Sequence, residues 1–306
     1  MPCGGRDCTL RPMSNTAPVK VIRPAGDRIA LVCDSPHSGT CYPQDFDFTI
    51  GLEQLRKCED TLVEQLWDTA PLVGATLVHA TFPRSYIDPN RAEDDIDVAM
   101  LDGEWAGPVA PSQPCLRLGN GLVFSKTPTL EPIYSRRLHA SEIAQRIESC
   151  WRPYRRALAD ALAGARTRQG GWWHLNLHSM PSNAYARLGL PEKPLADIVL
   201  GNLHGASCDA AFVDFVGEAF RRHGYSVALN DPYAGQDLVR SLGRPALGQH
   251  SLQIEINRGL YLDEKTREPK RRFPELRKRI HLVLQDIADY IREETIQAER
   301  KAKDTA

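Results

Sequence analysis

The stretch Ile29–Gly39, with the sequence IALVCDSPHSG, is the strongest indication of the fold in this chain. Its first five residues are apolar and are bounded by a polar turn, which predicts a short buried strand over residues 29–33. His37 follows on that turn, between Pro36 and Gly39, two residues that favour tight chain reversals. The stretch therefore predicts a buried strand that leads directly into an imidazole.

Two later segments repeat this arrangement of an apolar strand that ends in a reactive side chain. The sequence WWHLNL at residues 172–177 runs into His178, and SLQIEINR at residues 251–258 carries Glu255 late in its strand. Two imidazoles and a carboxylate at strand ends suggest a metal hydrolase site at the edge of an α/β sheet.

The rest of the chain alternates between strand-like and helix-like segments, a pattern typical of an α/β sandwich with a mainly parallel or mixed sheet. Strands are expected at residues 29–33, 74–82, 172–177, 197–201, 225–229 and 250–256. Helices are expected at residues 51–69, 140–165, 207–223 and 274–293.

One domain is expected, over residues 18–293, because the candidate site residues are spread along most of that length. Residues 1–17 are expected to be a disordered lead-in, and residues 294–306 a flexible charged tail. The stretch 102–135 is rich in Pro, Gly and Ser and is too long for a simple connection, so we expect a functional loop or a lid.

The composition excludes several classes of protein. The chain has 306 residues, 42% of them hydrophobic, which is enough for a large core, and a net charge of −1 gives no basic excess for binding nucleic acid. No apolar run approaches the roughly 20 residues that span a bilayer, and no apolar signal segment is seen, so we expect no membrane partner. The eight cysteines form no CxxC pair and are expected to be reduced thiols of a cytoplasmic protein.

His37 and His178 are the first two candidate metal ligands, and a zinc hydrolase usually supplies three from the protein. His174 lies four residues before His178, but four residues of strand span about 13 Å, too far for one metal. We therefore expect His178 to be the ligand and His174 to lie in the core or behind the ligands. Asp60 is the candidate third ligand, with Glu59 beside it as the alternative. Zinc suits two nitrogens and one oxygen, and other divalent ions suit them too.

Glu255 falls on the polar side of its strand, together with Gln253 and Asn257. A carboxylate there is costly to bury without a partner. Two interpretations stay open: an ion pair with Arg258 or another arginine, or a general base that takes a proton from a water activated by a metal.

The segment Phe82–Arg91, with the sequence FPRSYIDPNR, combines two arginines, an asparagine and an aspartate that can orient them. Arginine forms bidentate pairs with carboxylates, so this segment can clamp an anion. The alternative is a cluster of surface ion pairs. A clamp beside a metal would select an acidic substrate and polarise its carbonyl.

Several short motifs, taken in order, resemble one family, the N-formylglutamate amidohydrolases, over about residues 28 to 292. The matching pieces are PHSG at 36–39, ED at 59–60, the block at 84–91, LHSMPS at 177–182, ADIVLG at 196–201, NDPYAG at 230–235 and QIEINR at 253–258. The family is similar to the zinc carboxypeptidases and the aspartoacylase group. The resemblance implies a three-layer sandwich with a central mixed, largely parallel sheet flanked by helices.

The resemblance also implies roles for individual residues. It implies a zinc site formed by His37, His178 and Asp60, although Thr40 stands where the relatives' HxxE pair would place a carboxylate. Glu255 would be the general base. The remaining implied residues are Arg84, which would polarise the scissile carbonyl, Asn90 and Arg91, which would hold a substrate carboxylate, and Ser182, Tyr233 and Arg258 as further substrate-binding residues.

The function implied is metal-dependent hydrolysis of an N-acyl amino acid, above all of N-formyl-L-glutamate to formate and L-glutamate. The alternatives are a related zinc amidase for another N-acyl amino acid or a peptide end, and a non-catalytic protein that binds acidic metabolites. In either case the partner is a small acidic molecule. Gln236 follows Gly235 where the family pattern predicts a second glycine, and we expect this loop to help set the acyl-group specificity. The oligomeric state is left open.

Overall fold

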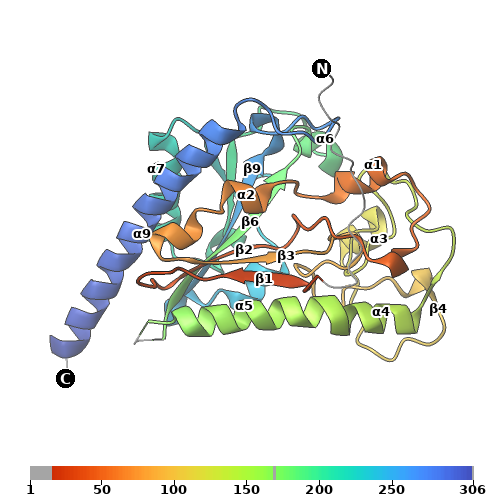
Figure 1. Cartoon of the computed structure of the whole chain (residues 1–306), viewed down its shortest axis with the longest axis horizontal. Coiled ribbons are helices and arrows are strands. Elements are labelled where there is room, and N and C mark those ends of the chain that lie inside the picture. The colour runs from red at the N-terminus through yellow and green to blue at the C-terminus, as the bar shows by residue number, and fades with distance from the viewer. Residues whose placement is uncertain (1–15, 168–169, 305–306) are drawn as a thin grey trace, which may run out of the picture.

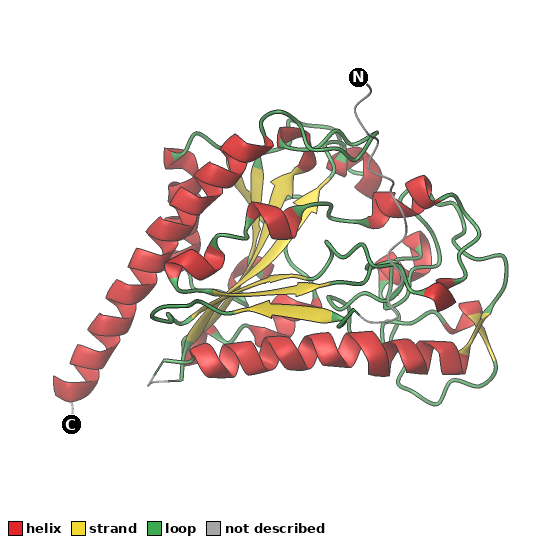
Figure 2. Ribbon diagram, in the orientation of Figure 1, coloured by secondary structure: helices red, strands yellow, loops and turns green. Residues whose placement is uncertain are grey.

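The computed structural model describes residues 16–167 and 170–304, so nearly all of the expected lead-in at residues 1–17 lies outside the described residues. A seven-stranded sheet forms the centre of the molecule (Figures 1 and 2). Its strands are β1 (Val19–Ile22), β2 (Leu31–Ser35), β3 (Thr76–Ala80), β6 (Trp172–Met180), β7 (Ile198–Gly201), β8 (Val227–Leu229) and β9 (Gln249–Asn257). A second, two-stranded sheet pairs β4 (Leu101–Asp102) with β5 (Leu138–His139).

The strand order in the large sheet is β1-β3-β2-β6-β9-β7-β8. Strands β3, β2, β6 and β9 are parallel neighbours, and β7 is parallel to β8. Two pairings are antiparallel, β1 with β3 and β7 with β9. The sheet is therefore mixed and largely parallel, which confirms the predicted fold class.

Helices cover both faces of the sheet, so the molecule has three layers (Figure 1). One face packs against α5 (Arg152–Ala165), and the other against α2 (Val63–Leu66), α7 (Ala210–Arg222) and α9 (Phe273–Asp304). The shorter helices are α1 (Leu52–Leu55), α3 (Gln113–Leu118), α4 (Ala140–Arg146), α6 (Ala184–Leu188) and α8 (Asp237–Leu242).

Side chains alternate across the two central strands as their sequences predict. Leu175 and Leu177 on β6, and Ile254 on β9, belong to the apolar core shared with α7 and α9. His178 and Glu255 point to the other side of the sheet and are both buried. The alternation therefore places the candidate site on the α5 side, at the carboxyl ends of the strands.

The predicted helix over residues 51–69 was wrong as one continuous element. It consists of α1, a 3₁₀ turn at Arg56–Cys58 and α2, with a break between them at which Leu62 has a φ of 64°. In the break, the Asp60 N–H donates to the His37 carbonyl oxygen at 3.0 Å. A contact with the His37 loop thus replaces a helical hydrogen bond and fixes Asp60 beside that histidine.

The predicted helix over residues 140–165 is confirmed as one continuous column, with a π-helical turn at Ile147–Trp151 between α4 and α5. At the other end of the chain, α9 runs through Asp304, into the segment where we expect a flexible tail. In the described residues, no helix combines the length and the apolar composition that crossing a membrane requires.

Candidate active site

A cavity opens at the carboxyl ends of β2, β6 and β9. His37 lies two residues past the end of β2, His178 lies near the end of β6, and Glu255 near the end of β9, and all three line this cavity. Part of the lining comes from the long stretch 102–135, which contributes Leu118, Asn120, Phe124, Lys126, Thr127, Pro128 and Leu130. The three chain segments singled out in the sequence therefore meet at one place.

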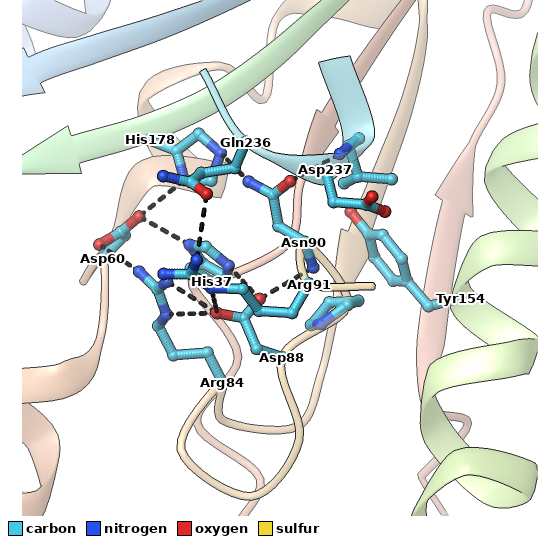
Figure 3. A network of polar contacts seen from close by, with 12 residues as sticks. His37, Asp60, Arg84, Asp88, Asn90, Arg91, Tyr154, His178, Gln236 and Asp237 are labelled. Carbon is cyan, nitrogen blue, oxygen red and sulfur yellow. Dashed lines mark hydrogen bonds and ion pairs between the residues drawn. The ribbon is translucent and has the colours of Figure 1, made fainter. Parts of the chain in front are cut away.

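Asp60 contacts both imidazoles from one side (Figure 3). Its Oδ2 atom is 3.3 Å from Nδ1 of His37 and 3.0 Å from Nδ1 of His178. The three side chains are buried, and their ligand atoms lie within 4.8 Å of one another. Asp60, rather than its neighbour Glu59, is thus the carboxylate that meets both histidines. Glu59 instead accepts a hydrogen bond from the hydroxyl of Tyr42.

The far nitrogen of each imidazole is held by the protein. Nε2 of His37 donates to Asp88 Oδ1 at 2.7 Å, and Nε2 of His178 donates to Asn176 Oδ1 at 2.7 Å. With the proton on Nε2, each neutral ring presents the lone pair of Nδ1 to Asp60. Three acceptors then converge on one point, and a positive charge between them relieves their repulsion.

The pKa values of these groups favour the forms that bind a metal. Burial, and then the nearby His37, lower the pKa of His178 to about 4, so its ring is neutral at neutral pH. Burial alone would raise the pKa of Asp60. The close contacts with His178 and His37 and the charge of Arg258 hold that pKa well below its usual value. Metals bind neutral imidazole and ionised carboxylate.

The donor set fits a divalent cation. With bonds of about 2.0–2.2 Å to nitrogen and oxygen, the ligand atoms of a tetrahedral zinc site lie about 3.3 Å apart. The two distances from Asp60 Oδ2 to the histidine Nδ1 atoms, 3.3 and 3.0 Å, are close to that edge length. Two nitrogens and one oxygen suit zinc and leave a fourth position open to the cavity.

A buried polar network supports His178 from behind. Asn176, which accepts from His178, donates through Nδ2 to Asp34 Oδ1 at 2.7 Å. The same oxygen lies 2.8 Å from Nε2 of His174, whose Nδ1 is 2.7 Å from Ser251 Oγ. His174 is fully buried and does not line the cavity, so it supports the ligands, as the strand spacing predicts.

Arg84 lies beside Asp60 and is oriented by Asp88. Its Nε and Nη2 atoms donate to Asp88 Oδ2 at 3.2 and 2.7 Å, and its Nη1 is 3.9 Å from Asp60 Oδ1. Burial alone would raise the pKa of Asp88, but the charge of Arg84 and the hydrogen bond from His37 lower it. Asp88 therefore stays ionised and fixes a metal ligand and an arginine together.

Arg91 lines the cavity with one nitrogen that makes no hydrogen bond with the described residues. Its Nη1 atom donates to Gln236 Oε1 at 3.1 Å, and its buried Nε atom lies 3.9 Å from Asp88 Oδ2, which leaves Nη2 without a hydrogen-bond partner among the described residues. Asn90 is engaged on both sides, because Nδ2 donates to Asn176 Oδ1 at 3.3 Å and Oδ1 accepts from the backbone of Leu238 at 2.9 Å. Arg91 is thus better placed than Asn90 to receive a ligand.

The helical column α4–α5 holds the arginine segment in place. Its side chains donate to three backbone carbonyls of that segment. They are Arg146 Nη1 to Tyr86 O at 3.1 Å, Trp151 Nε1 to Arg91 O at 3.0 Å, and Arg155 Nη1 to Pro89 O at 3.2 Å. Trp151 is the last residue of the π-helical turn, so that turn helps to aim its indole at Arg91.

Glu255 faces the cavity next to its strand neighbour Gln253, whose Nε2 donates to Glu255 Oε1 at 3.0 Å. Burial, and then the negative charge of Asp60, raise the pKa of Glu255 well above its usual value. The ion pair of Glu255 with Arg258, one of the two interpretations left open, is not formed. Arg258 Nη2 donates to Asp60 Oδ1 at 2.5 Å and to the Ser179 carbonyl oxygen at 2.9 Å.

Of the two other predicted substrate-binding residues, Tyr233 lines the cavity and Ser182 does not. Ser182 is exposed and is absent from the lining, and its hydroxyl donates to Asn257 Oδ1 at 3.3 Å and to Glu264. Sequence reasoning missed Arg187, which lies on α6 and lines the cavity, because its segment shows no motif.

Comparisons with known proteins agree on one family. A profile of the family described as "N-formylglutamate amidohydrolase" matches residues 29–262. An N-formylglutamate deformylase from Pseudomonas putida is 30% identical over 242 residues, covering 78% of this chain and 83% of the relative. The crystal structure of an N-formylglutamate amidohydrolase from Ralstonia eutropha JMP134 is 50% identical, with a TM-score of 0.88, over 91% of this chain and 100% of that one. The product of gene Atu2144 from Agrobacterium tumefaciens is 16% identical, with a TM-score of 0.65 over 93% of this chain and 100% of that one, and shares the fold.

Proposed function

Since this chain belongs to the N-formylglutamate amidohydrolase family, we propose that it hydrolyses N-formyl-L-glutamate to formate and L-glutamate. One observation carries the proposal: the acceptor atoms of His37, Asp60 and His178 converge in a cavity that also holds Glu255 and several arginines. A cytoplasmic location belongs to the proposal, and the free thiols of the described cysteines support it.

His37, Asp60 and His178 would hold a divalent cation, with zinc as the first candidate. When bound, the cation would polarise the scissile carbonyl and lower the pKa of a water molecule toward about 7. Asp88 and Asn176 keep both imidazoles in the tautomer that this requires.

Glu255 would take the proton from the attacking water and pass it to the amine that leaves. A raised pKa suits this role, because it makes the carboxylate a stronger base for the proton of the water. Gln253 fixes the orientation of the carboxyl group by donating to one of its oxygens.

Arg84 would stabilise the negative charge that develops on the carbonyl oxygen. Its guanidinium is held by Asp88 on one side and lies 3.9 Å from Asp60 on the other, so its position is set before substrate binds. Arg91 would bind the α-carboxylate through Nη2, which makes no hydrogen bond with the described residues. In this scheme Asn90 and Arg258 position their neighbours, and Ser182 has no role.

The experiment is to measure formate release from N-formyl-L-glutamate by the purified, zinc-loaded protein. N-acetyl- and N-succinyl-L-glutamate serve as competing substrates, with acetate and succinate as the measured products. We expect the highest kcat/KM for the formyl substrate. A higher value for another acyl group would assign the chain to a different amidase activity. If none of the three substrates were hydrolysed, the alternative of a non-catalytic binding protein would be favoured.

A further inference from the structure

The cavity carries much more positive charge than its own carboxylates balance. Its lining includes six Lys or Arg side chains, Lys57, Arg84, Arg91, Lys126, Arg187 and Arg258, against two carboxylates, Asp60 and Glu255. A cation held by the histidines adds to this excess. Asp88 and Asp95, which lie behind the lining, pair with Arg84 and Arg91. The positive charge that remains suits a dianion better than a ligand with a single negative charge.

Most of these cations already have protein partners. Arg84 is held by Asp88, Arg258 by Asp60, and Arg91 by Gln236, and Lys57 donates to Gln54. Among the described residues, no carboxylate or hydrogen-bond acceptor is paired with the side chain of Arg187 or with that of Lys126. The cavity therefore has two cations that are free to meet a ligand.

Arg187 is the better placed of the two. It lies on α6, which directly follows the β6 strand that carries His178. The helix is anchored by buried Ala184 and Tyr185, while Arg187 lines the cavity from the exposed side. Lys126 belongs to the long 102–135 stretch, which forms another part of the wall.

The electrostatic surroundings of Arg187 connect it to the reaction centre. Partial burial against the cavity wall, and then the positive charge of Arg258, lower the pKa of Arg187, and Arg84 contributes in the same direction. A guanidinium crowded by other guanidiniums gains from an anion that arrives with the ligand. Arginine also forms two parallel hydrogen bonds with a carboxylate, which lysine does not.

We infer that Arg187 binds the side-chain carboxylate of the substrate and makes the cavity selective for N-acyl amino acids with two carboxylates. The inference rests on the proposed function. Arg91 then binds the α-carboxylate, which is common to all N-acyl amino acids, and Arg187 binds the carboxylate of the side chain. Arg91 thus contributes to the affinity for every such substrate, and Arg187 determines which side chain is preferred.

The test compares N-formyl-L-glutamate with N-formyl-L-glutamine, which has nearly the same shape and no side-chain charge. For Arg187→Met we expect kcat/KM for the glutamate substrate to fall about 10- to 100-fold, mainly through KM, because a charge-assisted hydrogen-bonded pair is lost. The value for the glutamine substrate is expected to stay nearly constant. Arg187→Lys keeps the positive charge but loses the planar guanidinium that can donate two parallel hydrogen bonds. It should therefore keep only part of the preference for the glutamate substrate.

Lys126→Met is the matched control, because it removes the other unpaired cation of the cavity. We expect it to keep the preference for glutamate over glutamine. A preference that survives in Arg187→Met, or that disappears in Lys126→Met instead, would overturn the inference.

A binding measurement separates this inference from the proposed function. Calorimetric titration with L-glutamate and with L-glutamine measures the affinity of the same subsite without requiring turnover. Wild-type protein that releases no formate would contradict the proposed function alone. If it still bound L-glutamate in preference to L-glutamine, and Arg187→Met lost that preference, the subsite would stand. Equal binding of both amino acids by the wild type would remove it.

Discussion

His178 and Glu255 are directly paired residues on the neighbouring parallel strands β6 and β9. Both point to the same side of the sheet, so one strand carries a metal ligand and the next carries the proposed base. Paired strands lie about 4.8 Å apart, and this spacing is set by backbone hydrogen bonds. The separation between ligand and base is therefore fixed by the rigid centre of the fold rather than by a loop.

Glu255→Gln should abolish most of the turnover and leave the metal site intact. The amide keeps the shape of the side chain and can still accept from Gln253, but it cannot take a proton from water. We expect kcat to fall about 10²- to 10⁴-fold. Formate release and zinc content are measured on the same preparation. Glu264→Gln, a half-buried glutamate outside the cavity lining, is the control, and unchanged turnover in Glu255→Gln would exclude this base.

Asp88→Asn should weaken metal binding although Asp88 is not a ligand. Its carboxylate accepts from Nε2 of His37 and is held ionised by Arg84, so it keeps Nδ1 of that ring free for a cation. Loss of such a partner typically costs 10- to 100-fold in metal affinity, and we expect about that much. Zinc affinity is measured by competition with a chelator. Asp68→Asn removes an exposed carboxylate paired with Arg277 and should change nothing, and equal affinities in the two variants would contradict the role of Asp88.

Asp34 should contribute stability that depends on pH. Burial alone would raise its pKa, but hydrogen bonds from His174, Tyr154 and Asn176 lower it below the ordinary value. A pKa that is lower in the folded state gives stability above the unfolded-state pKa of about 3.9, and this stability is lost as the pH falls below that value. Removing one partner of a buried charged network costs about 3–5 kcal/mol, so Asp34→Asn should lower the free energy of unfolding by about that much at pH 7.

Urea denaturation of the metal-free protein at pH 7 and at pH 3.5 checks this prediction. The difference between wild type and Asp34→Asn is expected to shrink at the lower pH. Asp289→Asn replaces an exposed carboxylate on α9 and should show no such change. A difference that is constant over this range would mean that the charge of Asp34 is not what stabilises the fold.

Local sequence was enough to find His37, His178 and Glu255. Each follows or ends an apolar strand, and the alternation along a strand determines which face a residue occupies. Asp60 was a candidate because its segment follows the His37 loop, but the residues alone left Glu59 open as the alternative. The helix predicted around it is broken, because its backbone bonds to the His37 loop.

Other features depend on partners that a sequence does not reveal. Arg187 matters because no acceptor among the described residues is paired with it, and Arg258 because it pairs with Asp60 rather than with Glu255. Strand β1 was missed because it is short and half-exposed. Helix α9 extends past its apolar stripe, because residues 292–304 are mostly strong helix formers such as Glu, Arg, Lys, Gln and Ala.

The zinc content of the purified chain tests the central claim most directly. After zinc loading and removal of the excess, mass spectrometry of the metal should find about one zinc per wild-type chain, as a three-ligand site with one open position predicts. His37→Ala and His178→Ala should each lose it, while His139→Ala, an exposed histidine away from the cavity, should retain it. Wild-type protein without bound zinc, or equal zinc in all three variants, would contradict a metal centre formed by His37, Asp60 and His178.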